Sequence, residues 1–367
     1  MNFSLNDDQR MLQDAVQRLV EREYSFAHRR RYAAEPNGWS RKLWAQASEI
    51  GLPALLYPAE QGGLGGSAFD AMVVMQALGP AMPLDPWLPT LVLGAAALRR
   101  AAPPLQARWV PRIATGDWVL AWAEGGGCRV VADGEGWRLD GRIAHVLHGD
   151  SADALLVSAQ GDAGPALFVL HAQQPGLTRH ATRTHDGRRM ATLHFDTVQA
   201  QAADVIAPPG EAAALIESVR QAGIAALAAE AVGLMQWLLD TTVAYLKTRQ
   251  QFGGPIARFQ ALQHRAAEML MALELARGMA HYAAVMLDEP DSISRGQVLA
   301  AVKLQLTQAL RFVAEQAVQL HGGIGVTEEN AVGHGLKRAI VMAAEFGRYD
   351  EHLALFAQRG GFIEAAA

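Results

Sequence analysis

The sequence predicts a mainly α-helical protein with a small β domain between two helical regions. Three observations support this prediction. Apolar residues recur at helical spacing near the N-terminus, short alternating runs fill the middle, and long apolar stretches occupy the C-terminal half. A chain of 367 residues is long enough for two or three domains. We therefore predict an N-terminal helical domain over 1–115, a middle antiparallel β domain over 116–208 and a C-terminal helical bundle over 209–367.

The N-terminal region reads as helices with short connections. Leu12, Val16 and Leu19 recur at the spacing of one helix face, which predicts an amphipathic helix. The segment LPALLYPAEQGGLGGS has the glycines and prolines of a loop. A further apolar helix, AFDAMVVMQALG, is predicted to end at Gly79-Pro80.

From 117 to about 205 the chain shows short alternating runs such as WVLAWAE, ALFVLHAQ and ATLHFDTVQ. Turn residues separate the runs at intervals of roughly ten residues, a spacing typical of a sandwich or barrel. We therefore predict antiparallel strands for this region.

Three long helices are predicted after the β region, over about 211–250, 258–288 and 294–320. The first is followed by Phe252-Gly253-Gly254-Pro255, a glycine stop before a proline. The third ends at Gly322-Gly323. This order of helices, strands and helices predicts an all-helical framework interrupted by a β domain.

Composition narrows the class of protein. A formal charge of −5 argues against a nucleic-acid binder, whose surface is usually basic. The single cysteine, Cys128, excludes a disulfide framework and favours a reducing compartment, most simply the cytoplasm. No His/Cys cluster has metal-ligand spacing, so no metal is expected. The apolar run IAALAAEAVGLMQWLL contains Glu230 and is predicted to be a buried helix rather than a membrane span.

Two helix ends carry residues suited to ligand binding. Arg249 closes one helix, where its guanidinium can form charge-assisted hydrogen bonds to a phosphate group. Gln260 opens the next helix, where free backbone N–H groups can meet a polar ligand. Gln319 precedes a pair of glycines, which allow a ligand to approach the backbone closely.

Together these segments resemble the acyl-CoA dehydrogenase family over nearly the whole chain. PAEQGGLGG (58–66) resembles the N-terminal signature, and YLKTRQQFGGPIARFQ (245–260) and QLHGGIGVTEE (319–329) resemble the two C-terminal signatures. In that family the arginine and glutamine of these motifs reach across a subunit interface to the FAD of a neighbour. The resemblance implies that the FAD-binding residues here are Arg249, Phe252, Gly253, Gln260, Gln319, Gly322 and Gly323.

The resemblance also implies a reaction and an assembly. The family removes hydrogen from the α and β carbons of an acyl-CoA thioester. A glutamate takes the α proton, and the β hydrogen leaves as hydride to N5 of the flavin. Such an enzyme needs a base, a grip on CoA and contacts that hold the flavin. Members are tetramers built from dimers, with the C-terminal helices at the interface.

The sequence departs from the family at the catalytic base. The two usual glutamate positions align with Phe346 and Gly223. Two other acids are candidates, Glu230 and Glu345. Glu345 is displaced by one residue, which turns a helical side chain by about 100°. Glu230 follows Gly223 by seven residues and therefore shares its helix face, roughly 10 Å further along. The alternative is that Glu230 is a buried acid paired with a cation and that Glu345 has an ordinary surface role.

Other family contacts are altered too. The aspartate and arginine that help hold the acyl-CoA fall at Gln221 and Ile224, and the segment beside the flavin reads His145-Val146-Leu147-His148. A leucine cannot donate the hydroxyl hydrogen bond of the threonine it replaces. The segments VLHGDSAD and AEAVG are similar to small subunits of heteromeric members, of the pimeloyl-CoA dehydrogenase small-subunit type.

Three hypotheses follow. The first is an FAD-binding small subunit completed by a homologous large subunit, acting on a medium-chain or dicarboxylic acyl-CoA. The second is a self-sufficient homo-oligomeric dehydrogenase that uses Glu230 or Glu345. The third is a scaffold of the same fold that binds neither flavin nor substrate.

Overall fold

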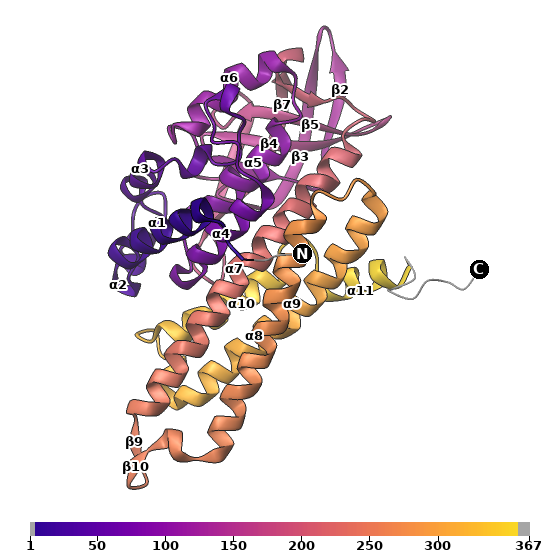
Figure 1. Cartoon of the computed structure of the whole chain (residues 1–367). Coiled ribbons are helices and arrows are strands. Elements are labelled where there is room, and N and C mark those ends of the chain that lie inside the picture. Colours follow the sequence, from indigo (N-terminus) through magenta and orange to yellow (C-terminus); the bar gives the residue numbers. More distant parts are fainter. Residues whose placement is uncertain (1–3, 359–367) are drawn as a thin grey trace, which may run out of the picture. The chain divides into compact units, whose positions relative to one another are not determined.

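The computed structural model describes residues 4–358. Its N-terminal helices are α1 (Asp7–Glu23), α2 (Phe26–Ala33), α3 (Arg41–Glu49), α4 (Ala68–Leu78), α5 (Gly94–Leu98) and α6 (Pro103–Ala114), with a π-helical segment over Leu88–Leu93 (Figure 1). Asn6 begins α1 with a capping box, since its side chain accepts a hydrogen bond from the backbone N–H of Gln9 and the Gln9 side chain accepts one from the backbone N–H of Asn6. Val16 and Leu19 are buried, which confirms the predicted helix face.

The middle region forms one sheet with the strand order β6-β7-β3-β2-β4-β5-β8, and β1 pairs with β4. Its strands are β1 (Leu120–Ala123), β2 (Cys128–Asp133), β3 (Gly136–Leu147), β4 (Ala154–Gly161), β5 (Gly164–His171), β6 (Leu177–Arg183), β7 (Arg189–Ala200) and β8 (Val205–Ala207). The prediction of antiparallel pairing is right for most neighbours but wrong for β1 and β2, each of which runs parallel to β4. Alternation of apolar residues reports the two faces of a strand but not the direction of its partner.

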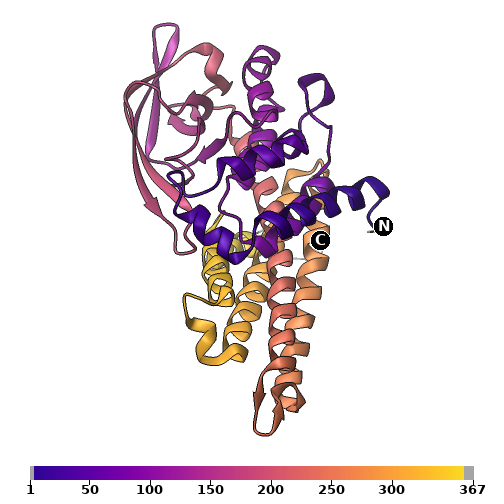
Figure 2. The ribbon, with the colours of Figure 1, turned by 90° about the vertical axis from the view of Figure 1, so that its left-hand side faces the viewer.

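The C-terminal region consists of long helices, as predicted. They are α7 (Ala213–Thr248), α8 (Gln260–Met286), α9 (Ser292–His321), α10 (Ala331–Ala344) and α11 (Tyr349–Gln358). The ends of the first three lie within a few residues of the predicted positions, because glycine and proline stops mark them. The strands β9 (Gln250–Gln251) and β10 (Gly254–Pro255) form a short hairpin between α7 and α8, which lie side by side (Figure 2).

The chain folds into two compact units. The first comprises Met1–Phe26, Ala68–Pro83 and Ile224–Ala367, and the second comprises Ala27–Ser67 and Leu84–Gly223. The first unit therefore joins short N-terminal segments to the C-terminal helices. The division into 1–115, 116–208 and 209–367 stays a prediction, and residues 1–3 and 359–367 at its outer limits lie outside the described part of the chain.

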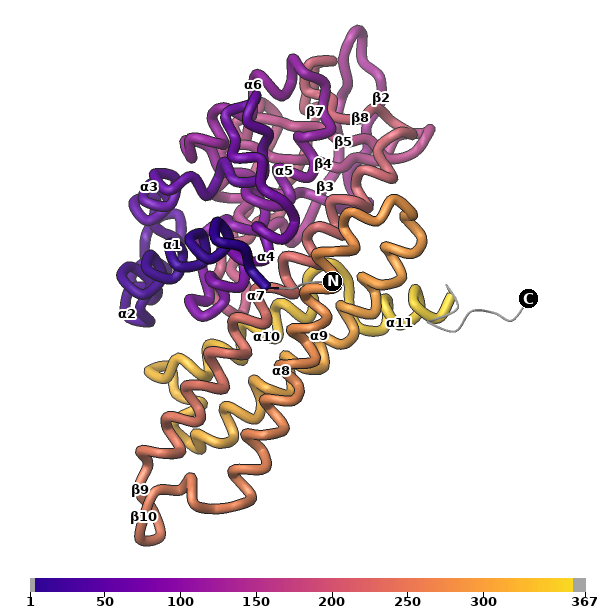
Figure 3. Tube along the Cα trace, viewed as in Figure 1, coloured from indigo at the N-terminus to yellow at the C-terminus, as the bar shows by residue number. Residues whose placement is uncertain are grey.

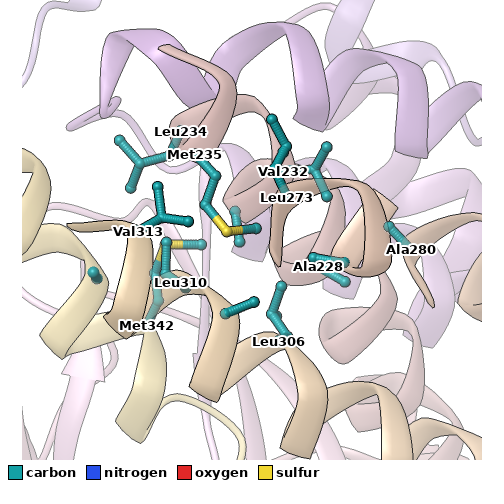
Figure 4. Packing of buried hydrophobic residues seen from close by; sticks show 14 of the residues in the cluster. Ala228, Val232, Leu234, Met235, Leu273, Ala280, Leu306, Leu310, Val313 and Met342 are labelled. Atoms are coloured by element: carbon teal, nitrogen blue, oxygen red, sulfur yellow. The ribbon is translucent and has the colours of Figure 1, made fainter. Parts of the chain in front are cut away.

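The core of the first unit is formed by α7, α8, α9 and α10. Figure 4 shows the contribution of each helix, with Met235 from α7, Leu273 from α8, Leu310 from α9 and Met342 from α10. All four side chains are fully buried or nearly so. Within residues 4–358, α7 alone is long and apolar enough to cross a membrane, and 83% of its most apolar stretch is buried. That burial is what the prediction of a core helix requires.

Two glycines allow α4 and α7 to cross closely in this unit. A Cβ added at Gly233 would lie 2.0 Å from the carbonyl oxygen of Gln76, and one added at Gly79 would lie 2.3 Å from that of Glu230. Neither position has room for a side chain, since real Cβ atoms stay more than about 3 Å from such oxygens. The crossing fixes the part of α7 that carries Glu230.

Candidate functional site

The β9–β10 hairpin lies at the end of α7 (Figure 3). Arg249 is the residue between α7 and β9. Gln251 pairs with Gly254, so Phe252 and Gly253 form a two-residue loop. Both have positive φ, +55° and +82°, as a type I′ turn requires. Glycine adopts this conformation freely, whereas a phenylalanine there is strained by about 1 kcal/mol or more. The Phe252 side chain is 79% exposed, so burial does not compensate for the strain.

An open hollow of about 600 Å³ lies where the ends of α7 and α9 meet the hairpin. Among the residues predicted to bind FAD, its lining contains Arg249, Phe252, Gln319, Gly322 and Gly323. Gly253 and Gln260 do not line it. Gly253 belongs to the hairpin loop, and Gln260 is an exposed residue at the start of α8. The structure therefore brings together residues from two motifs that lie about seventy positions apart in the sequence.

The chemistry of the hollow suits a phosphorylated, partly flat ligand. Arg249 is exposed and forms no salt bridge with residues 4–358, so its guanidinium is available to an anion. Gln319 is also exposed and adds an amide donor and acceptor. A Cβ added at Gly322 or Gly323 would have no atom within 4 Å, so the backbone there is bare. These groups fit the diphosphate and rings of FAD.

The sequence prediction missed part of this lining. The hollow is also lined by eight residues that were not predicted: Tyr245, Gln251, Ile256, Phe259, Ala261, Leu262, Leu320 and His321. The rings of Tyr245 and His321 stack with centroids 4.4 Å apart and an interplanar angle of 21°. Tyr245 precedes Arg249 by four residues, so the two share a helix face, and this spacing was the available signal. No comparable local signal pairs Tyr245 with a residue of α9.

The two candidate bases are held by the same arginine. Arg338 of α10 donates from Nε to Oε1 of Glu230, at 2.9 Å, and from Nη1 to Oε1 of Glu345, at 2.9 Å. The side chains of Arg338, Glu230 and Glu345 are 1%, 3% and 11% exposed. The alternative of a buried Glu230 paired with a cation therefore describes the structure. A surface role for Glu345 is wrong, because this residue directly follows α10 in an extended conformation and its carboxylate binds Arg338.

Lys303 of α9 lies in the same buried region. Its Nζ donates a hydrogen bond to the carbonyl oxygen of Met342 at 2.7 Å, and the residue is fully buried. Burial lowers the pKa of Lys303 to about 8, although the nearby Glu345 carboxylate opposes the shift. The Glu345 carboxylate thus lies near two cationic side chains, those of Arg338 and Lys303.

The usual base positions lack a carboxylate, as the sequence states. Gly223 is a buried residue of α7. Phe346 packs against the core of the first unit and has a φ of +57°, and His352 contacts its carbonyl oxygen through Nε2 at 2.8 Å. The turn after α10 is therefore ordered around an apolar side chain.

Gln221, an altered position in the second unit, is engaged within the chain. The Gln221 side chain is buried and donates to Glu217 at 2.9 Å. A glutamine side chain carries no charge, so Gln221 does not reproduce the charge that the family uses to hold its substrate.

Comparison with known proteins decides the family. Residues 6–117 match the acyl-CoA dehydrogenase N-terminal domain, and residues 221–360 match the acyl-CoA dehydrogenase C-terminal domain. The acyl-CoA dehydrogenase IpdE2 of Mycobacterium tuberculosis is 31% identical over 336 residues, which cover 91% of each chain. This chain belongs to the acyl-CoA dehydrogenase family. The family is one of FAD-dependent oxidoreductases, so the family, the enzyme class and the cofactor expected from the motifs are all confirmed.

Two solved structures share the fold over the whole length. The ChsE4-ChsE5 complex from Mycobacterium tuberculosis has a TM-score of 0.92 and 26% identity, with 100% of each chain covered. A variant of the Tcur3481-Tcur3483 steroid ACAD has a TM-score of 0.89 and 26% identity, with 97% of this acyl-CoA dehydrogenase and 98% of the other chain covered. The predicted fold class, helical ends around a central sheet, is confirmed.

Proposed function

We propose that this chain is the small subunit of a heteromeric acyl-CoA dehydrogenase that carries out α,β-dehydrogenation of an acyl-CoA in the cytoplasm. In this proposal the chain contributes the hollow around Arg249 and Gln319 to an FAD held jointly with a homologous large subunit. The large subunit supplies the catalytic base.

One observation carries the proposal. Glu230 and Glu345 both bind Arg338 in the interior, while Arg249 faces an open hollow. A general base must reach the proton that it removes, within about 3 Å or through one water. A carboxylate held by a buried guanidinium is poorly suited to that role, because taking up a proton would weaken the pair. The chain therefore keeps the parts that serve a shared cofactor, whereas both of its candidate bases, Glu230 and Glu345, are bound to an arginine.

The roles of this chain's residues follow from their chemistry. Arg249 would bind the diphosphate as a charged fork, and Gln319 would fix the neighbouring polar groups. The bare backbone of Gly322 and Gly323 would allow close approach. FAD, when bound, supplies the flavin that accepts hydride from the β carbon. Aromatic residues around the hollow, such as Phe252 and Phe259, would exclude water from it.

The surface of α8 supports an oligomer. Met271, Leu275 and Tyr282 lie on one face of this helix and are 66%, 62% and 38% exposed, and Leu270 beside them is 47% exposed. Contiguous exposed apolar side chains typically mark an interaction surface. A homologous helix of a partner subunit would bury them. The ChsE4-ChsE5 structure is a complex and the Tcur3481-Tcur3483 neighbour also carries two names, which favours a different chain over a second copy.

Coexpression tests the proposal directly. We expect the chain alone to lack dehydrogenase activity and the complex with a homologous large subunit to be yellow, with absorbance near 450 nm. The assay uses reduction of the bound flavin by medium-chain, dicarboxylic and steroid acyl-CoA thioesters. The last class is included because the Tcur3481-Tcur3483 neighbour is described as a steroid ACAD. Full activity of the purified single chain contradicts the proposal.

A charge variant tests the hollow. Arg249→Ala in this chain removes the guanidinium, and we expect FAD to bind the complex about 10- to 100-fold more weakly, as loss of a charge-assisted hydrogen bond predicts. Arg311→Ala is the matched control, because Arg311 is an exposed residue of α9 paired with Glu315 outside the hollow. Equal FAD affinity of the two variants places the cofactor elsewhere.

A further inference from the structure

His321 is held in one tautomer by the end of its own helix. Its Nδ1 lies 2.8 Å from the carbonyl oxygen of Ala317. A carbonyl oxygen only accepts hydrogen bonds, so Nδ1 carries the hydrogen. Burial lowers the pKa of His321 below its usual value, against the opposing effect of that hydrogen bond, and the ring is neutral at pH 7. Its Nε2 is therefore a hydrogen-bond acceptor.

The position of the ring directs Nε2 to the hollow. His321 is 5% exposed and lines the hollow, with one ring face stacked on Tyr245. Nε2 makes no hydrogen bond with residues 4–358. It is also not one of the fully buried, unpaired polar atoms of this part of the chain. The small exposed part of the ring thus includes the acceptor nitrogen. Stacking fixes the ring plane, and the Ala317 hydrogen bond fixes its rotation.

Two other polar side chains of the hollow, those of Arg249 and Gln319, differ from this one. Arg249 only donates, and the amide of Gln319 can do either, but it is exposed and its orientation is not fixed by any hydrogen bond to residues 4–358. His321 therefore supplies a fixed acceptor beside a cationic group. A ligand that satisfies both groups needs an anionic group for Arg249 and, next to it, a hydroxyl or amino hydrogen for His321. A dinucleotide diphosphate flanked by sugar hydroxyls has this pattern.

We propose that Nε2 of His321 accepts a hydrogen bond from a hydroxyl or amino group of the FAD held in this hollow, which makes His321 a positioning residue for the cofactor. This inference rests on the proposed function, since it takes the hollow as an FAD site. Tyr245 supports the role by holding the imidazole ring in place.

The test measures FAD affinity of the purified complex, stripped of flavin and titrated with FAD while flavin fluorescence is followed. His321→Phe keeps a ring that can stack on Tyr245 and removes the acceptor, so the dissociation constant rises about fivefold, as loss of one neutral hydrogen bond predicts. His321→Gln places an amide oxygen near the position of Nε2 and restores affinity to within about twofold of wild type. His321→Leu provides a second apolar replacement.

The melting temperature of the flavin-free complex distinguishes loss of the acceptor from structural damage. We expect this temperature to be equal in His321→Phe and His321→Gln. The acceptor role is overturned when these two variants bind FAD equally well or equally poorly. An unchanged affinity in His321→Phe together with weakened binding in Arg249→Ala overturns this inference and leaves the proposed function intact. Unchanged affinity in both variants overturns the FAD site itself.

Discussion

Two regions of the same helix bundle differ in whether their charged side chains are paired within the chain. Near the middle of α7, Glu230 is buried and bound to Arg338, which also binds Glu345. At the end of α7, Arg249 is exposed beside a hollow and pairs with no acid in residues 4–358. The first region satisfies its charges within the chain, whereas the second leaves a cation for an outside ligand. A charged residue in or near a family position is thus evidence for a site only when the fold leaves its charge available to a ligand.

The largest effect is expected from breaking the buried region. Arg338→Met leaves two carboxylates without their guanidinium, and removing one partner of a buried ion pair costs about 3–5 kcal/mol of unfolding free energy. Urea unfolding measures it, with Arg311→Met as the control on an exposed pair, where the cost stays below about 1 kcal/mol. Adding Glu230→Gln and Glu345→Gln to Arg338→Met should restore part of the loss. Equal midpoints for Arg338→Met and Arg311→Met would show that the cluster is not a buried ion pair.

A pH series tests the same region through Lys303. The folded pKa of about 8 lies below the value near 10.5 of an unperturbed lysine. Between these values the unfolded chain holds a proton that the folded chain has lost, so this group makes the protein more stable as pH rises, by at most about 1.4 kcal/mol per pH unit. We expect the stability of wild type relative to Lys303→Met to increase from pH 8 to pH 10. Lys247→Met, at an exposed position of α7, is the control, and parallel curves for wild type and Lys303→Met contradict the prediction.

The open hollow beside Arg249 is tested by a substitution that adds a methyl group to its lining. Gly323 has no atom within 4 Å of an added Cβ, and its φ is not positive, so Gly323→Ala should leave the flavin-free chain as stable as wild type. The methyl group would project where a ligand approaches the backbone, and we expect FAD to bind the complex several-fold more weakly, about 1 kcal/mol. Isothermal titration of FAD measures this change. Unchanged affinity would mean that no ligand contacts this glycine.

The smallest effect on the rate of flavin reduction is expected from replacing the two candidate bases, although replacing a true base would give the largest effect. Glu230→Gln and Glu345→Gln in the coexpressed complex should change the rate of flavin reduction by acyl-CoA less than about twofold, because neither acid is free to take a proton. Loss of a general base slows a reaction by about 10²- to 10⁴-fold. Stopped-flow absorbance near 450 nm distinguishes the two results. A large loss in either variant identifies that glutamate as the base and contradicts the small-subunit proposal.

Much of the fold was predictable because its signals are local. Glycine and proline stops fixed the ends of α7, α8 and α9 to within a few residues, and alternating runs located the strands. The parallel pairing of β1 with β4 was not predictable, since it joins segments some thirty residues apart and leaves no mark on alternation. Five residues that line the hollow had been singled out in the two motifs, but the stacked pair Tyr245 and His321 of the same motifs had not.

By itself the sequence determined the family, the cofactor and the absence of glutamate at Phe346 and Gly223, because these depend on which residue occupies a motif position. Only the tertiary structure decided the state of the remaining acids. Glu230 and Arg338 are separated by 108 positions, and their contact exists because α7 and α10 pack in one core. Desolvation and ion pairing depend on that packing. Glu230 is therefore a candidate base by its place in the sequence, but in the folded chain it is paired with Arg338.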